Sequence, residues 1–444
     1  MPNRTGYTTS LDAVSAARCD VLVVGSGPAG STIAALLAER GRRVVIVEKD
    51  RHPRFHIGES LLPLNLPLFE RLGVKEQIER IGMIKYGVEF VSPYHGRAVT
   101  REFAQAWDKS LPYSYQVRRS EFDHVLLKNA AAKGAEVIEG CRVAAVEFPA
   151  EGGAVIKGRE EGGTERRWEA DFLVDASGRD TLLAGQLGLK KRNRKHNSAA
   201  IFGHFTGARR LTGKAEGHIS IFWFDHGWFW FIPLADGTTS VGAVCPPDYI
   251  KSRKTDLTSF LMSTIAMCPE IADRLKDAQL AAAVHATGNY SYSADRMAGR
   301  SYILVGDAYA FIDPIFSTGV YLAMITAFLG ADAVEACLRE PTKAPQVLRR
   351  YEKQARRGLQ AFTWYIYRVR NPALRDLFMS SRSPLRIGDA VLSLLAGDAF
   401  GRSPIGWRLT AFKVIYYMQS LLHLRSGIKA WRIRRRSAQL ETAG

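Results

Sequence analysis

Residues 21–30, VLVVGSGPAG, decide the fold of this chain. Four apolar residues run directly into the pattern G-x-G-x-x-G, and residues 31–39 that follow are typical of a helix. Gly25 permits a tight turn, Gly27 lets the backbone approach a phosphate, and Gly30 lets the helix pack closely on the strand. The segment therefore predicts a strand, a phosphate-binding loop and a helix, which open a Rossmann-like fold.

The residues around this loop predict a bound dinucleotide. Pro28 and Ala29 begin the helix, whose free N–H groups and dipole would face the phosphates. Residues 43–47, RVVIV, are typical of a second strand. Glu48 ends that strand near the separation expected for a carboxylate that accepts a hydrogen bond from a ribose hydroxyl. These features alone are compatible with FAD and with NAD.

The size and composition of the chain are those of a globular protein. Its 444 residues suffice for one large domain with insertions or for two or three smaller domains. Five scattered cysteines form no CxxC pair and no metal-ligand spacing, so we expect reduced thiols, no metal site and a cytoplasmic protein. The sequence predicts neither a secretory signal nor a membrane-spanning segment.

The order of predicted elements divides the chain into four parts. Residues 1–18 are expected to be a flexible extension. Residues 19–198 and 290–340 are expected to form a discontinuous dinucleotide-binding domain, and short aromatic and β-branched runs in residues 199–289 predict an antiparallel substrate layer. Residues 341–444 are mainly helical in composition and end in a basic tail. The predicted class is α/β, with a Rossmann-like core, an antiparallel sheet layer and a helical C-terminal region.

The net charge of +17 favours acidic partners, such as an anionic membrane or an acidic protein, and no nucleic-acid-binding motif is present. Residues 401–444 hold nine Lys/Arg and one acidic residue. Residues 409–424 alternate between polar residues and the apolar Phe412, Ile415, Tyr416, Leu421 and Leu422. Such a helix can lie on a membrane surface, or it can pack on its own domain with its basic side chains in water.

Two later stretches resemble flavoproteins of the glutathione-reductase type. Residues 175–179, DASGR, end a predicted buried strand, and Gly306-Asp307 precede a predicted long helix. In such proteins the carboxylate of the late Gly-Asp pair accepts a hydrogen bond from the ribitol chain of FAD. The resemblance therefore implies FAD as the cofactor and Asp307 as one of its ligands, and Arg119 is a further candidate contact.

Three more stretches resemble flavin-dependent halogenases of the phenol- and pyrrole-directed type, within the FAD-binding monooxygenase superfamily. Residues 228–233, WFWFIP, match the signature W-x-W-x-I-P. Residues 58–63, GESLLP, resemble an early loop of these enzymes, and residues 313–319, DPIFSTG, resemble their chloride- and flavin-contacting loop. The resemblance covers about residues 19–340.

This resemblance implies a chemistry. Reduced FAD from a separate flavin reductase, O2 and chloride or bromide would give hypohalous acid, which halogenates an electron-rich aromatic ring. Lys85 stands where the halogenases have the lysine that holds or carries this species. The resemblance places a second set of residues at the substrate and halide: Trp228, Trp230, Pro314, Phe316, Ser317, Thr318 and Gly319, the last of which would also contact the cofactor.

One position departs from part of the family. Tryptophan-directed halogenases carry a glutamate just before the Ser-Thr pair, where this chain has Phe316. We therefore expect a phenol or a pyrrole as substrate. Several relatives act on substrates tethered to acyl carrier proteins, which are acidic, and the net charge of +17 would suit such a partner.

Other functions are compatible with the same scaffold. An FAD-dependent monooxygenase, reductase or dehydrogenase without halogenation would share everything except Lys85 and the residues placed at the substrate and halide. A monooxygenase would reduce its own flavin with NAD(P)H. The basic tail and the aromatic residues 362–367, FTWYIY, suit an oxidoreductase that acts on a lipid-like chain at a membrane surface. A non-enzymatic flavin-binding or carrier-docking subunit is a further alternative.

Overall fold

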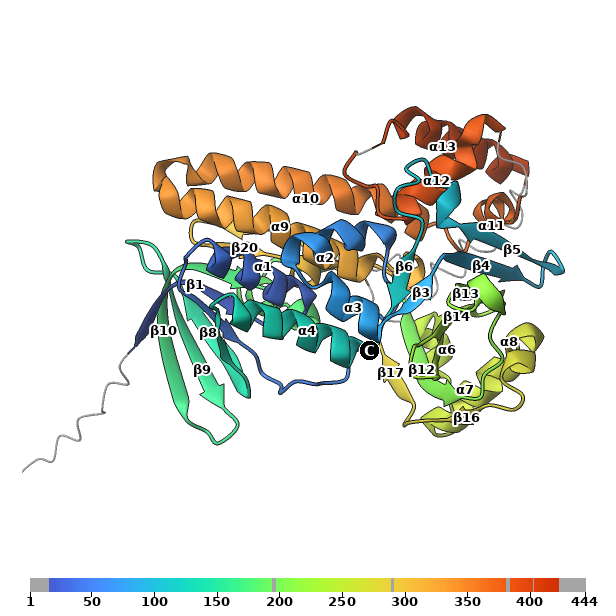
Figure 1. Ribbon diagram of the computed structural model, residues 1–444, viewed down its shortest axis with the longest axis horizontal. Helices are drawn as coiled ribbons and strands as arrows, with labels where there is room; N and C mark the ends of the chain where they lie inside the picture. Colours follow the sequence, from blue (N-terminus) through green and yellow to red (C-terminus); the bar gives the residue numbers. More distant parts are fainter. Residues whose placement is uncertain (1–15, 194–196, 289–290, 381–383, 402, 423–444) are drawn as a thin grey trace, which may run out of the picture.

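Five parallel strands form the centre of the first of two eight-stranded sheets (Figure 1). The computed structural model describes residues 16–193, 197–288, 291–380, 384–401 and 403–422. The five strands, in spatial order, are β20 (Tyr302–Leu304), β10 (Glu165–Asp175), β1 (Ala17–Val24), β2 (Val44–Val47) and β7 (Glu136–Ile138). The predicted opening unit and the α/β class are confirmed. Because the strands are parallel, their carboxyl ends meet at one edge, which brings the loops after them together.

Helices cover this sheet. α1 (Pro28–Glu39) packs against α4 (Arg119–Ala132) and against α9 (Thr318–Arg339), and α9 lies beside α10 (Ala344–Ile366) along most of its length (Figure 1). By length and composition α9 could cross a membrane, but most of its apolar window is buried, as in the core helix of a globular protein. α9 therefore links the dinucleotide-binding part to the C-terminal helices.

The remaining elements of this part are short. A hairpin of β8 and β9 extends the sheet beyond β10, and residues 66–81 form two helices because Gly73 ends the first in a left-handed conformation. Their bounds are α2 (Leu66–Leu72), α3 (Lys75–Ile81), β8 (Cys141–Glu147), β9 (Ala154–Glu160), α5 (Leu182–Gln186) and β19 (Ala298–Gly299). Three short strands form a separate sheet: β11 (Lys190–Arg192), β18 (Tyr292–Ala294) and β21 (Ala310–Phe311).

The second large sheet contains the predicted antiparallel layer. Its order is β16-β12-β15-β14-β13-β4-β5, and β17 also pairs with β12. The bounds are β4 (Gly87–Ser92), β5 (Arg97–Glu102), β12 (Ala199–Thr206), β13 (Ile219–Phe224), β14 (Gly227–Pro233), β15 (Thr239–Cys245), β16 (Gln279–Leu280) and β17 (His285–Thr287). A two-stranded ribbon of β3 (Met83–Lys85) and β6 (Ser114–Gln116) stands apart from it.

One predicted boundary needs correction. β4 and β5 come from the part of the chain that the sequence assigned to the dinucleotide-binding domain, but β4 pairs in parallel with β13, with residue 88 opposite residue 219. The second sheet thus includes residues 87–102 as well as residues from 199 onward. A pairing between strands so far apart in sequence has no local signature.

The alternation of β14 gives the second sheet two different faces. Trp228, Trp230 and Ile232 point to the face that packs with α9, with the loop before it and with helices from later in the chain, while Phe229 and Phe231 pack on the other face. That other face is covered by α6 (Pro247–Lys251), α7 (Leu257–Ala266) and α8 (Pro269–Arg274). A Cβ on Gly242 of β15 would lie 2.3 Å from the indole of Trp230, so glycine there lets the ring lie across the sheet.

The C-terminal region is a cluster of helices: α11 (Pro372–Met379), α12 (Ile387–Leu395) and α13 (Gly406–Leu422). Phe362 and Tyr365 of the aromatic run are buried in its core. These buried residues of the run therefore help to hold the helices together, while Trp364 and Tyr367 are only partly buried. Residues 1–15 of the expected extension and residues 423–444 of the basic tail lie outside the described residues.

Candidate active site

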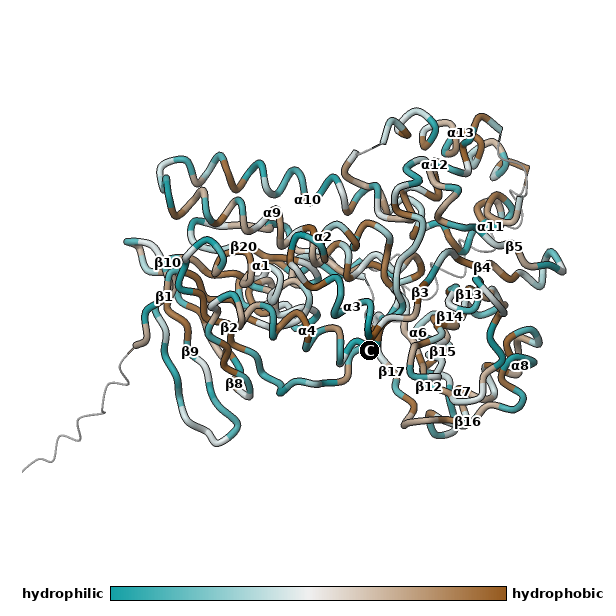
Figure 2. The backbone as a smooth tube through the Cα atoms, viewed as in Figure 1, coloured by the Kyte–Doolittle hydropathy of each residue, from teal (hydrophilic) through white to brown (hydrophobic). Residues whose placement is uncertain are grey.

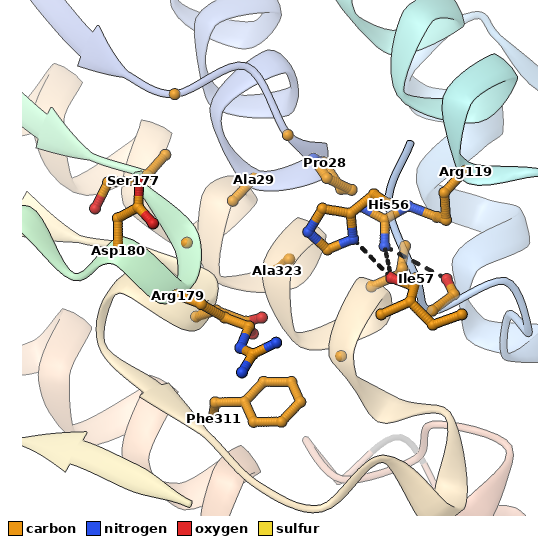
Figure 3. A pocket seen from close by; sticks show the side chains of 18 of the residues that line it. Pro28, Ala29, His56, Ile57, Arg119, Ser177, Arg179, Asp180, Phe311 and Ala323 are labelled. Atoms are coloured by element: carbon orange, nitrogen blue, oxygen red, sulfur yellow. Dashed lines mark hydrogen bonds between the residues drawn. The ribbon is translucent and has the colours of Figure 1, made fainter. Parts of the chain in front are cut away.

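A cavity of about 630 Å³ opens where the strands of the first sheet end and faces β14 of the second sheet (Figure 3). It brings together most of the residues that the sequence singled out: Gly25, Gly27, Pro28, Ala29, Glu48, Arg119, Trp228, Trp230, Asp307, Pro314, Ser317, Thr318 and Gly319. Three expected site residues, Gly30, Lys85 and Phe316, are not in its lining. A different packing or hydrogen-bond contact explains the position of each of these three residues.

The glycine loop at one end of the cavity is shaped for a phosphate group. Gly25 has a φ of +94°, and a Cβ there would lie 2.5 Å from the carbonyl oxygen of Ala176. A Cβ on Gly30 would lie 1.9 Å from the carbonyl oxygen of Gly25, so Gly30 acts by packing and not by lining. α1 begins after Gly27 without a side-chain cap, which leaves its first N–H groups free for a ligand. These residues fit the pyrophosphate of FAD.

Glu48 is a buried, ionised acceptor beside this loop. Its Oε2 accepts hydrogen bonds from the backbone N–H and the hydroxyl of Ser26, both at 2.7 Å, and its Oε1 accepts one from the N–H of Asp50. Burial opposes ionisation of Glu48, but the charge of Arg54 and these hydrogen bonds hold the pKa of the carboxyl below its usual value. An anionic acceptor at this place suits the ribose of FAD.

Two arginines stand over the loop, and the sequence singled out only one of them. Arg119, at the start of α4, donates to both carboxylate oxygens of Asp123. It also donates to the carbonyl of Ile57 (Figure 3). Arg54 lies between Asp123, at 3.5 Å, and Glu48, at 4.0 Å, and its guanidinium is 3.8 Å from where a Cβ of Gly27 would be. Arg54 is thus placed to meet the cofactor phosphates, and only the tertiary structure reveals it.

We expect the substitution Arg54→Gln to weaken FAD binding by about 10- to 100-fold, because a charge-assisted hydrogen bond contributes about 1.5–3 kcal/mol. The measurement is titration of the apoprotein with FAD, followed by the quenching of flavin fluorescence. Arg51→Gln is the matched control, since Arg51 is exposed and pairs only with the exposed Glu161 among the described residues. Equal affinities of the two variants would contradict the role of Arg54.

The middle of the cavity is closed by Arg179 of the DASGR turn. Its guanidinium donates to the hydroxyl of Thr287 and the carbonyl of Gly288, and it lies 5.5 Å from the ring centre of Phe311 (Figure 3). The turn thereby joins the first sheet to β17 of the second. Asp307 lines the same region, where burial raises the pKa of its carboxyl to about 6 although nearby arginines lower it. A ribitol hydroxyl could meet this carboxyl as donor or as acceptor.

The far end of the cavity meets the loop before α9. Asp313 holds this loop by accepting hydrogen bonds from the hydroxyl of Ser198 and the N–H of Ile315. Ser317 has a left-handed φ of +55° and precedes α9 without a side-chain cap, so the N–H groups of the first helical turn face the cavity. Trp228 and Trp230 form the opposite wall, and the Trp230 N–H donates to Ser240.

Phe316 does not reach the cavity. Its ring is buried in the core of the C-terminal region, with its centre 5.9 Å from that of Phe378 on α11. The left-handed turn at Ser317 reverses the direction of the chain at this point. This arrangement corrects the expectation that Phe316 contacts substrate or halide, since the side chain has a packing role.

Lys85 lies behind the cavity wall, one hydrogen bond away from it. Its ammonium donates to the hydroxyl of Ser60, at 2.9 Å, and to the carbonyl of Leu61, at 2.7 Å, and Ser60 lines the cavity. Only 2% of the Lys85 side chain is exposed, and both acceptors are uncharged. Burial therefore lowers the pKa of Lys85 to about 7, which makes the neutral amine available near neutral pH.

This pKa predicts a pH dependence of stability. Between about pH 7 and pH 10.5 the unfolded chain binds a proton at Lys85 that the folded chain lacks, so the free energy of unfolding rises with pH in this window. In this window the free energy of unfolding of the wild type should rise by up to about 1.4 kcal/mol per pH unit relative to that of a Lys85→Met variant. Urea unfolding of both proteins across this range measures it. If the difference in the free energy of unfolding between the two proteins did not change with pH, Lys85 would be charged in the folded protein throughout this range.

A second buried pair lies beside Lys85 on the cavity wall. Glu59 of the GESLLP loop is buried, and its Oε1 is 2.8 Å from Nε2 of His204 on β12. The other carboxylate oxygen of Glu59 has no hydrogen-bond partner among the described residues. The pair joins this loop to the second sheet and fixes the cavity wall on which Ser60 lies. His204 carried no signal in the sequence, because a single histidine in a strand is most often a packing residue.

Comparisons with known proteins show which proteins this chain is similar to. The family model of an FAD binding domain matches residues 18–363. A tryptophan 2-halogenase of Chondromyces crocatus is 37% identical over 72% of this chain, and the match spans 61% of that relative, which is less than two thirds. A 1H-pyrrole-2-carbonyl peptidyl-carrier protein chlorinase of Pseudomonas fluorescens is 29% identical over 86% of this chain and 89% of its own. The solved structure of the myxobacterial chondrochloren halogenase CndH has a TM-score of 0.75 and 31% identity, and it covers 91% of this chain and 96% of its own.

Proposed function

Because this chain belongs to the flavin-dependent halogenases, we propose that its cavity makes hypohalous acid from reduced FAD, O2 and a halide, and that this acid halogenates an electron-rich aromatic ring. The observation that carries the proposal is the Lys85 amine, which is held by uncharged acceptors one hydrogen bond behind the cavity wall. The site residues below are part of the same proposal.

The residues present fit FAD along the whole cavity. Bound in reduced form, FAD supplies the two electrons that turn O2 and a halide into an electrophilic halogen species. The glycine loop, Arg54 and Glu48 would hold its adenine end, and Asp307 would contact its ribitol. Trp228 and Trp230 close the opposite wall and exclude water, which protects a reactive species from hydrolysis.

Lys85 is the proposed relay. Its neutral amine can take the halogen from hypohalous acid, as the O–X bond breaks, an N–X bond forms and water leaves with the amine proton. Alternatively its N–H can donate a hydrogen bond to hypohalous acid, and a pKa of about 7 leaves both forms accessible. The hydroxyl of Ser60 lies between the Lys85 amine and the cavity, and its oxygen accepts a hydrogen bond from that amine. Ser317, Thr318 and Gly319 are the proposed halide site, because the N–H groups at the start of α9 face the cavity there.

We propose a phenol or a pyrrole as substrate, either free or carried on an acidic acyl carrier protein. The Pseudomonas relative is named for a carrier-bound pyrrole, and the net charge of +17 suits an acidic carrier. Since Phe316 does not line the cavity, its identity is a weaker argument against tryptophan than the sequence suggested. Tryptophan therefore belongs in the substrate panel.

A separate flavin reductase is the proposed source of reduced FAD, because the sequence holds no second G-x-G-x-x-G loop for a nicotinamide nucleotide. A cytoplasmic location is also a proposal. It is supported by the five cysteines, all of which are free and buried.

The test uses purified protein, FAD, a flavin reductase with NADH, O2 and bromide. Phenols, pyrroles and tryptophan are offered free and, where chemistry allows, on a carrier protein. Mass spectrometry reads the bromine isotope doublet. A doublet that requires the reductase supports the proposal. Oxygen insertion, or NADH consumption without the reductase, would instead assign the protein to the monooxygenases.

A further inference from the structure

The C-terminal helix α13 carries a stripe of exposed hydrophobic side chains. Thirteen large hydrophobic residues are exposed among the described residues, and six of them are on this one helix. They recur at helical spacing and share one face. The α13 stripe consists of Trp407, Val414, Tyr417, Met418, Leu421 and Leu422, which are 52% to 87% exposed.

Of the apolar residues that the sequence singled out on this helix, only Leu421 and Leu422 belong to the stripe. Phe412 and Tyr416, which the sequence placed on the candidate membrane face, are buried against the aromatic core of the C-terminal region. Ile415 also packs there. Leu421 and Leu422 are exposed, at 71% and 87%. α13 therefore has two apolar faces, one that holds it to the protein and one that nothing among the described residues covers.

The position of α13 leaves the stripe accessible. The helix lies at the outer edge of the molecule, far from the FAD-binding sheet (Figure 1). Parts of its backbone are coloured as hydrophobic in Figure 2. From Trp407 to Leu422 the stripe extends for about 22 Å along the helix. A convex helix of this length presents a ridge and not a groove, which suits insertion into a soft surface better than capture of a peptide.

Basic side chains flank the stripe. The Arg408 guanidinium lies 4.3 Å from the ring centre of Trp407 and 4.1 Å from that of Trp107, and Lys413 lies 5.3 Å from that of Trp364. Arg368 donates to the hydroxyl of Tyr417. Among the described residues none of these three cations forms an ion pair with a carboxylate. Their charges thus remain available to an anionic partner.

The chain beyond α13 continues the same chemistry. Directly after Leu422, residues 423–444 contain six Lys/Arg and one Glu. Such a segment is attracted to an anionic lipid surface, where each basic residue adds to binding. A second copy of this chain is a poor occupant by comparison, because each copy has a net charge of +17 and the two would repel each other.

We propose that the α13 stripe and its basic flank bind an anionic lipid surface, with the helix lying in the plane of the interface. The aromatic side chains Trp407 and Tyr417 suit the headgroup region, and Leu421 and Leu422 suit the acyl boundary. The enzyme would then work at a membrane without spanning it. This inference stands on the surface of α13 and does not depend on halogenation.

Vesicle flotation of the full-length protein tests the proposal. We expect at least about tenfold more protein on vesicles with about 30% phosphatidylglycerol than on phosphatidylcholine alone, and less binding as salt rises from about 0.1 M to 0.5 M. The double substitution L421E/L422E should lower binding at least about tenfold, since it places two charges in the stripe. L187E/M262E, at exposed positions elsewhere, is the matched control and should float like the wild type.

Each other result would overturn the proposal. These results are no flotation of the wild type, equal flotation on neutral vesicles, and flotation that L421E/L422E leaves unchanged. A lipid-free dimer that L421E/L422E converts to monomer would assign the stripe to a second copy. Binding to an acidic carrier protein that L421E/L422E abolishes, without flotation, would assign it to that partner. FAD titration and melting curves of both double variants confirm that they are folded.

Discussion

Substituting Lys85 by methionine is expected to lower halogenation by about 1,000-fold or more while FAD still binds. The relay needs the amine that Lys85 holds behind the cavity wall, and methionine keeps the length and apolar stem of the side chain without the nitrogen. Lys85→Ala should abolish halogenation equally. Methionine is preferred because it leaves no cavity at this fully buried position. The measurement is the yield of brominated product, with FAD affinity determined on the same sample.

Two further variants sharpen this test. Lys75→Met removes a lysine that pairs with Glu70 on the surface, so it should halogenate like the wild type. Lys85→Arg keeps the hydrogen-bonding capacity but cannot lose its proton, so it should fail if the neutral amine is the working form. Normal product yield from Lys85→Met would show that the relay assignment is wrong. Loss of FAD affinity in that variant would show that Lys85 acts through the fold.

Replacing Gly30 by alanine is expected to reduce FAD affinity by about 100-fold or more and to destabilise the protein by about 3 kcal/mol. The added Cβ would lie 1.9 Å from the carbonyl oxygen of Gly25 and 3.2 Å from the Cβ of Ala176. Because the first contact is with backbone, α1 must move away from the phosphate loop to relieve it. The measurements are FAD titration and urea unfolding of the apoprotein.

Gly185→Ala is the control for this variant. Gly185 lies in helix α5, and a Cβ there would meet nothing within 4 Å, so the change should alter stability by no more than about 1 kcal/mol and leave FAD binding intact. If Gly30→Ala bound FAD as the wild type does, close packing of α1 would not be what shapes the phosphate site.

Local features of the site could be predicted from the sequence. The phosphate loop and Glu48 follow from a short pattern of glycines and from the spacing to the next strand, and the resemblance to the halogenases implied the place of Trp228 and Trp230. Such patterns depend only on backbone geometry within a few residues, so no knowledge of distant contacts is needed. The structure places these residues around one cavity, except for Gly30, which packs behind the phosphate loop.

Features that depend on distant partners could not be predicted in this way. Arg54 gains its role from Asp123 and Glu48, and Arg179 gains its role from the strand β17. The direction of Phe316 depends on a left-handed residue and on α11. The burial of one face of α13 likewise depends on aromatic residues of α10, about fifty positions earlier in the chain.

The pairing of β4 with β13 has a consequence for how the protein is made. β4 leaves the ribosome long before its parallel neighbour, since residue 88 must wait for residue 219. During synthesis the ribbon of β4 and β5 therefore has an unpaired, apolar edge, and such edges bind other chains. The dinucleotide-binding half cannot mature as an independent unit either, because β20 and α9 follow the second sheet in the chain. Production of soluble enzyme should thus respond strongly to chaperones that shield strand edges during translation.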